Sequence, residues 1–260
     1  MADSSRPADS AAASASDAAR ALEAAIPVEA TAGTPGRGGW LSACVRTLLR
    51  TVTQPRASFR RTPEPIAHGR ALGYLATLRL PPWAVLMGLQ AMRLMADRTP
   101  ALPLRSIHTL VDPPFVQALS AWQVLMVPVG LPLSYFFCGL LAHVGIALTG
   151  GATRSIGASM RAVGYASGPT LLAIGLLDLP LYLGDMPSEI YLPAAAAAIV
   201  PLLVLGGISL ARTHQFSLLR GLLVMIWPVL LVAVEVLLRA ALVLRTLPGI
   251  DVPDQPYYVP

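Results

Sequence analysis

The chain has 260 residues, of which 55% are hydrophobic and 13% are charged, and its mean hydropathy is +0.62. An ordinary water-soluble domain carries about a quarter charged residues, so this composition excludes that class and favours a membrane protein. The net charge is +5 and all 19 basic residues are arginines scattered along the chain, which argues against a nucleic acid partner. The two cysteines, Cys44 and Cys138, fall in different segments and predict neither a disulfide framework nor a zinc site.

The first 38 residues are rich in alanine, serine and aspartate. They contain no apolar run long enough for a cleaved signal peptide. Such low-complexity sequence cannot bury enough apolar area to offset the entropy of ordering. We therefore expect residues 1–38 to form a disordered tail in the cytosol.

Residues 39–70 are expected to form a basic amphipathic helix and a connector. Apolar residues recur at helical spacing at Trp40, Leu41, Cys44, Val45, Leu48, Leu49 and Val52. Such a helix beside a membrane region usually lies in the headgroup plane. The basic residues here either contact anionic lipids or set the topology; they are Arg46, Arg50, Arg56, Arg60 and Arg61.

Five transmembrane spans are predicted, at 71–95, 122–148, 162–183, 190–210 and 221–244, followed by a short proline-rich tail at 245–260. The fourth contains no charged residue and covers ~30 Å as a helix, the thickness of the hydrocarbon core. The first is the weakest, because it carries Arg79, Pro81, Pro82 and Arg93.

The loop charges predict the orientation. With the N-terminus in the cytosol, ten arginines fall in the inside segments and three in the outside segments, as the positive-inside rule requires. The C-terminus is then outside. The predicted fold class is an all-α polytopic integral membrane helix bundle. The bias toward Ala, Gly, Pro and Arg is typical of a GC-rich bacterial genome, so we expect a bacterial inner (cytoplasmic) membrane.

The segment between the second and third spans, CGLLAHVGIALTGGATRSIGASMRAVGYASGPTLL, contains a histidine, a glycine pair and Tyr-Ala-Ser-Gly-Pro. Together with TQPRASF at 53–59 and LARTHQFSLLRGLL at 210–223, it resembles the Yip-one domain family (YIP, Ypt-interacting-protein type) over roughly residues 48–244. The family-like motif residues are His143, Gly150, Gly151, Tyr165 and Pro169. The resemblance implies five spans and a cytosolic N-terminus. In eukaryotes the family is associated with membrane traffic and Rab-type GTPases, a role without an obvious counterpart in bacteria.

Ionisable residues inside a bilayer are candidates for function because they are costly to keep there. Asp178, Glu235 and Arg239 lie at one depth when their spans are built as helices, and Glu235 and Arg239 are spaced i,i+4. We infer a cluster of these three that links spans three and five. It is either an ion network that fixes helix register, a proton or solute pathway, or a set of snorkelling groups without mutual contact.

His143 lies near the cytosolic end of the second span. It is either a packed or interfacial hydrogen-bonding residue or a ligand or proton relay. His214 is interpreted as a solvated loop residue. Gly164 and Gly168 form a pair that lets another helix approach, either within the chain or in a dimer.

No zincin motif, metal-spaced cysteine pair, phosphate-binding loop or serine-hydrolase elbow is found. We therefore expect no enzyme, cofactor or metal, and predict a YIP-type membrane protein for membrane organisation or partner recruitment. The alternative is a small proton- or solute-coupled transporter or channel that uses the Asp178, Glu235 and Arg239 cluster. An intramembrane hydrolase with Ser159 is a third hypothesis. The expected partners are the lipid bilayer, including anionic lipids, and a protein partner or a second copy of the chain.

Overall fold

The computed structural model of the chain describes residues 26–30, 39–60, 66–95, 125, 127–183 and 186–244. All regular secondary structure in this part of the chain is helical. The helices are α2 (Pro27–Ala30), α3 (Gly39–Thr53), α4 (Pro55–Ser58), α5 (His68–Met95), α8 (Gly130–Leu148), α9 (Ile156–Leu183), α10 (Ser188–His214) and α11 (Leu218–Leu244). The predicted all-α fold class is confirmed.

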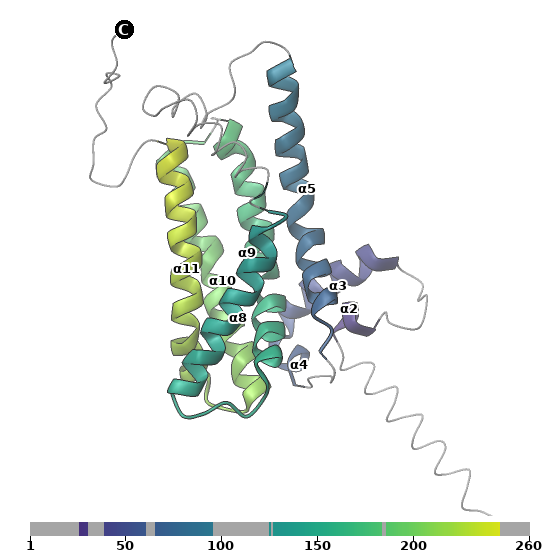
Figure 1. Ribbon diagram of the computed structural model, residues 1–260, viewed down its shortest axis with the longest axis vertical. Helices are drawn as coiled ribbons and strands as arrows, with labels where there is room; N and C mark the ends of the chain where they lie inside the picture. Colours follow the sequence, from purple (N-terminus) through teal and green to yellow (C-terminus); the bar gives the residue numbers. More distant parts are fainter. Residues whose placement is uncertain are drawn as a thin grey trace, which may run out of the picture.

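The long helices α5, α8, α9, α10 and α11 form one bundle, in which α9 packs against α5, α8 and α10, and α11 packs against α8 and α10 (Figure 1). The α8–α9 and α10–α11 connections lie at the same end of the bundle (Figure 1). Helices α2 and α3 lie at its side next to α5, and α4 packs against α10. Helices α9, α10 and α11 each run opposite to the helix before them, as short connections require.

Four helices within the described residues are long and apolar enough to cross a membrane, at 130–148, 156–181, 189–214 and 218–237. The chain is therefore a multi-pass membrane-type helix bundle of about the expected number of spans. The predicted first span corresponds to α5, which is not one of the four. Its 28 residues cover ~42 Å, so its length suffices, but its arginines and its two internal prolines make it less apolar.

The predicted third span begins too late and the predicted fourth span ends too early, in both cases at the end nearest an arginine. Helix α9 begins at Ile156 rather than at residue 162, and α10 continues to His214 rather than ending at residue 210. Charged and polar residues mark both predicted ends, but Arg161 and His214 are buried by partners in the fold. Gln215 follows as the C-terminal cap of α10, and its left-handed φ of 59° is an ordinary conformation at a helix C-terminus.

Glycines on α9 permit close helix approach. A Cβ added at Gly164 would lie 2.5 Å from the ring of Tyr135 on α8, and one at Gly168 would overlap the hydroxyl of Tyr74 on α5. Both glycines therefore serve contacts within this chain. Their contribution to a dimer stays a prediction.

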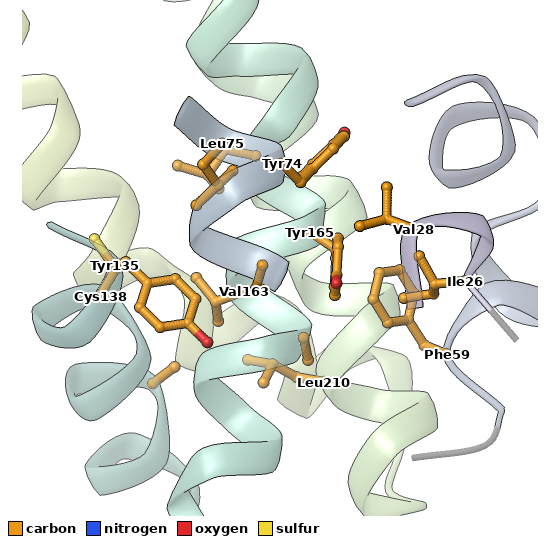
Figure 2. Close-up of a cluster of buried hydrophobic side chains, with 14 of the residues drawn as sticks. Ile26, Val28, Phe59, Tyr74, Leu75, Tyr135, Cys138, Val163, Tyr165 and Leu210 are labelled. Atoms are coloured by element: carbon orange, nitrogen blue, oxygen red, sulfur yellow. The ribbon is translucent and has the colours of Figure 1, made fainter. Parts of the chain in front are cut away.

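The prediction of a disordered tail is wrong for residues 26–30. Ile26 and Val28 are almost fully buried, and Figure 2 shows them with Phe59 beside Tyr165 of α9. These apolar side chains interrupt the Ala/Ser-rich sequence and bury against the bundle, which offsets the entropy of ordering them. The other predicted tail residues, 1–25 and 31–38, and the proline-rich tail at 245–260 lie outside the described residues.

Candidate functional site

Helix α3 has three different faces. Ala43, Cys44, Thr47 and Thr51 are buried against the rest of the protein. A second arc is apolar and turned outward, with exposed fractions of 69% for Leu41, 54% for Val45, 58% for Leu49 and 49% for Val52. At 100° per residue these four side chains fall within about 80° of the helix circumference. The third face carries Arg46, which is exposed, and Arg50, which is half-buried.

The bundle fixes the orientation of α3. The indole Nε1 of Trp40 donates to Thr77 Oγ1 on α5 at 2.8 Å, and the Trp40 ring lies over Gly73, where a Cβ would come within 3.1 Å. The backbone N–H of Val28 donates to Thr47 Oγ1 at 3.1 Å. These contacts hold the apolar arc of α3 away from the bundle.

Residue Glu29 of α2 forms a buried ion pair with Arg161 of α9. The Arg161 Nε and Nη2 atoms donate to Glu29 Oε1 and Oε2, each at 2.5 Å. This bidentate geometry is typical of strong guanidinium–carboxylate pairs. Arg161 is 1% exposed and also lies over the Tyr165 ring, 5.7 Å from its centroid. The Nη1 atom of Arg70 on α5 donates to the Glu29 carbonyl oxygen at 2.6 Å. This pair was not predicted, because Glu29 falls in the predicted tail and Arg161 just outside the predicted third span.

The structure gives Asp178, one member of the predicted Asp178, Glu235 and Arg239 cluster, a partner that was not predicted, and contact among the three stays a prediction. This carboxylate pairs with Arg79 of α5, whose Nη2 donates to Asp178 Oδ2 at 2.5 Å, and both side chains are buried. The Tyr191 hydroxyl of α10 donates to Asp178 Oδ1 at 3.4 Å. The side chain of Arg239 lies outside the described residues, and Glu235 is half-buried on α11.

The Arg79–Asp178 pair was not predicted because hydropathy treats each arginine separately. Arg79 was counted only as a penalty on the first span, although a buried arginine requires a carboxylate partner. A Cβ at Gly175 would lie 2.8 Å from Arg79 Nη1, so the missing side chain makes room for this guanidinium. The pair joins α5 to α9 and supports an ion network that fixes helix register; a proton or solute pathway stays a prediction.

His143, Ser159 and His214 form a polar bridge between α8, α9 and α10. Ser159 Oγ lies 3.0 Å from His143 Nδ1 and 2.9 Å from His214 Nε2, so its hydroxyl donates to one imidazole and accepts from the other. Ser159 is fully buried and His214 is 1% exposed, so the interpretation of His214 as a solvated residue is wrong. His143 is a packed hydrogen-bonding residue. Because the Ser159 hydroxyl is fully buried, this geometry does not support attack on a substrate.

The glycine pair of the family-like motif forms the end of α8. Gly150 and Gly151 have φ of 133° and 87°, values that side chains strain to adopt. Arg220 of α11 clamps this turn: its Nη2 donates to the carbonyl oxygens of Ile146, at 2.7 Å, and Gly151, at 3.0 Å. A cation at these carbonyls also complements the negative end of the α8 dipole.

The remaining motif residues lie further along α9. Tyr165 is fully buried, with its ring tilted against that of Tyr74 at 5.4 Å between centroids, and Pro169 is half-buried within the helix. The residues of the family-like motif therefore lie in two places: the glycine pair at the end of α8, and Tyr165 and Pro169 within α9. Among the basic residues predicted to contact lipid, Arg46, Arg56 and Arg60 are exposed, whereas Arg61 lies outside the described residues.

Comparison of the chain with protein-family models, with curated proteins and with solved structures finds no match. The resemblance to the YIP family therefore rests on the motifs in the sequence.

Proposed function

We propose that this chain is a YIP-type, non-enzymatic membrane protein that organises the bilayer through α3, with its N-terminus in the cytosol of a bacterial cell. The observation that carries the proposal is the three-faced geometry of α3. One face packs on the bundle, one presents four exposed apolar side chains, and one carries Arg46 and Arg50. This is the division of faces that a helix needs to lie at a lipid–water boundary.

The energetics favour lipid contact for this arc. Fully burying an exposed leucine or valine contributes ~1.5–3 kcal/mol. Covering the exposed half of Leu41, Val45, Leu49 and Val52 therefore contributes roughly 3–6 kcal/mol. Because Trp40 and Thr47 already hold α3 in place, little ordering entropy opposes this gain.

An environment-sensitive fluorophore tests the orientation of α3. We would attach it to Val45→Cys on the apolar arc and, as the matched control, to Arg46→Cys on the neighbouring face. Both native cysteines are buried, so the label is directed to the new site. In liposomes we expect a blue-shifted emission at position 45 and a water-like emission at position 46. Water-like emission at both positions would overturn the proposal.

A second experiment separates membrane organisation from partner recruitment. Liposomes containing the parent protein are compared by electron cryomicroscopy with liposomes containing Val45→Ser/Leu49→Ser, and crosslinking through α3 is carried out in native membranes. A change of vesicle shape that the parent produces and the variant does not produce supports organisation. Unchanged vesicles, together with one protein crosslinked at α3, assign this surface to a partner instead and overturn the lipid role.

The proposed orientation is tested with single cysteines at the two ends of the bundle. Ala152→Cys lies in the α8–α9 connection and Glu189→Cys in the first turn of α10. Labelling from outside intact cells is expected at residue 189 and not at residue 152. The opposite pattern would reject a cytosolic N-terminus.

A further inference from the structure

A pocket of about 140 Å³ lies where α4 meets the end of α10 and the start of α11. It is lined by Arg56, Ile208, Ala211, Arg212, Phe216 and Leu218. Helix α4 packs against α10, and the connection between α10 and α11 is three residues long, so the pocket walls are held by neighbouring elements (Figure 1).

The polar part of the pocket is positively charged. Arg56 and Arg212 come from different elements and both are exposed. The first turn of α11 begins at Leu218 in the pocket wall, and the start of a helix carries a partial positive charge. Within the described ranges, two of the carboxylates are engaged elsewhere, Glu29 with Arg161 and Asp178 with Arg79. A third, Glu189, lies at the opposite end of α10 from Arg212.

The rest of the pocket is apolar. Ile208, Ala211, Phe216 and Leu218 provide hydrocarbon next to the two guanidinium groups. A small inorganic anion would leave this apolar wall uncovered. A phospholipid covers both parts, because its phosphate is joined to glycerol and acyl chains.

We propose that this pocket binds the phosphate group of an anionic phospholipid, with Arg56 and Arg212 on the phosphate oxygens and the apolar wall against the glycerol and acyl region. Guanidinium groups suit this ligand because their donors match the spacing of phosphate oxygens. The site is separate from the apolar arc of α3, and its occupation does not depend on membrane deformation by that helix.

The test uses the purified full-length protein in a mild uncharged detergent, with thermal stability as the readout. A short-chain phosphatidylglycerol, the matching phosphatidylcholine and inorganic phosphate are titrated separately. We expect phosphatidylglycerol to raise the melting temperature at concentrations at least tenfold below those needed for phosphatidylcholine. Equal protection by inorganic phosphate would assign the pocket to a free anion and overturn the lipid proposal.

Variants test whether phosphatidylglycerol stabilises the protein through this pocket. Arg56→Gln/Arg212→Gln is expected to weaken the response to phosphatidylglycerol at least tenfold, and Arg212→Gln alone by a smaller factor. The matched control for the single variant is Arg154→Gln, which removes one charge from an exposed position outside the pocket and is expected to keep the response. Leu218→Gln is expected to weaken lipid binding through the apolar wall while the protein without lipid melts as the parent does. An equal response from Arg212→Gln and Arg154→Gln would overturn the assignment to this pocket. The result of these titrations does not depend on whether α3 deforms vesicles. The pocket proposal and the α3 proposal can therefore fail separately.

Discussion

Removal of the Glu29 carboxylate tests how the N-terminal segment is held. In Glu29→Ala, the Arg161 guanidinium loses both charge-assisted hydrogen bonds to Glu29 while only 1% of its residue surface is exposed. Removing one partner of a buried ion pair costs about 3–5 kcal/mol, because the remaining charge stays desolvated. The carbonyl contact of Arg70 to Glu29 uses the backbone and survives the substitution.

Detachment of α2 from the bundle limits this loss of stability. If α2 leaves the bundle, Arg161 regains water, and the protein loses the burial of Ile26 and Val28. Burial of two such side chains contributes ~3–6 kcal/mol, which is close to the loss at the ion pair. We therefore expect Glu29→Ala to lose about 3 kcal/mol or more and to release α2 in a substantial fraction of molecules.

Two measurements check this expectation. Unfolding is followed by titration with a denaturing detergent, and release of α2 by maleimide labelling of Val28→Cys with and without Glu29→Ala. The matched control is Glu189→Ala, which removes an exposed carboxylate and should change stability by less than ~0.5 kcal/mol. Glu29→Leu/Arg161→Met replaces the pair with apolar side chains and should recover most of the loss. Stability within ~0.5 kcal/mol of the parent and a protected residue 28 in Glu29→Ala would refute the reasoning.

Three further predictions concern buried side chains. Asp178→Asn leaves Arg79 without its buried charge partner and should cost about 3 kcal/mol in the same titration. If the transporter hypothesis is correct, the parent drives pH-dependent flux in liposomes and this variant does not; the absence of flux in the parent rejects the hypothesis. Ser159→Ala deprives two imidazoles of their shared hydroxyl and should cost ~1–3 kcal/mol, measured as a lower melting temperature. Burial raises the pKa of the Cys44 thiol, and Cys138 is buried as well, so at pH 7 the folded protein should react slowly with maleimide and the unfolded protein quickly. Fast labelling of the folded protein at pH 7 would contradict the burial of both.

The sequence predicted the apolar helices well, because their signal is local. An uncharged run such as 190–210 has the length and composition of a span whatever surrounds it. The periodicity of apolar residues also predicted the helix at 39–53, since that pattern is a property of the segment itself. The outward direction of its apolar arc depends on Trp40 and Thr47 contacts that no local pattern specifies.

The buried polar contacts were not predictable in the same way. Hydropathy reasoning assigns a penalty to each arginine separately, so it shortened α9 at Arg161 and weakened the first span at Arg79. In the fold each of these arginines has a carboxylate partner far away in the sequence, 132 residues away for Arg161 and 99 for Arg79. His214 was misread for the same reason, because its partners Ser159 and His143 lie on other helices. The only signal for Glu29 was an acidic residue beside the apolar pair Ile26 and Val28.

The separation between Glu29 and Arg161 also sets an order of events during biosynthesis. The ribosome adds about 5–20 residues per second, so the 132 positions between them take roughly 7–26 s to translate. Throughout that interval the Glu29 carboxylate lacks its ion-pair partner, although α2 can already contact Thr47 of α3 and Arg70 of α5. The ion pair that anchors α2 to α9 is therefore completed late, after residue 161 has been translated.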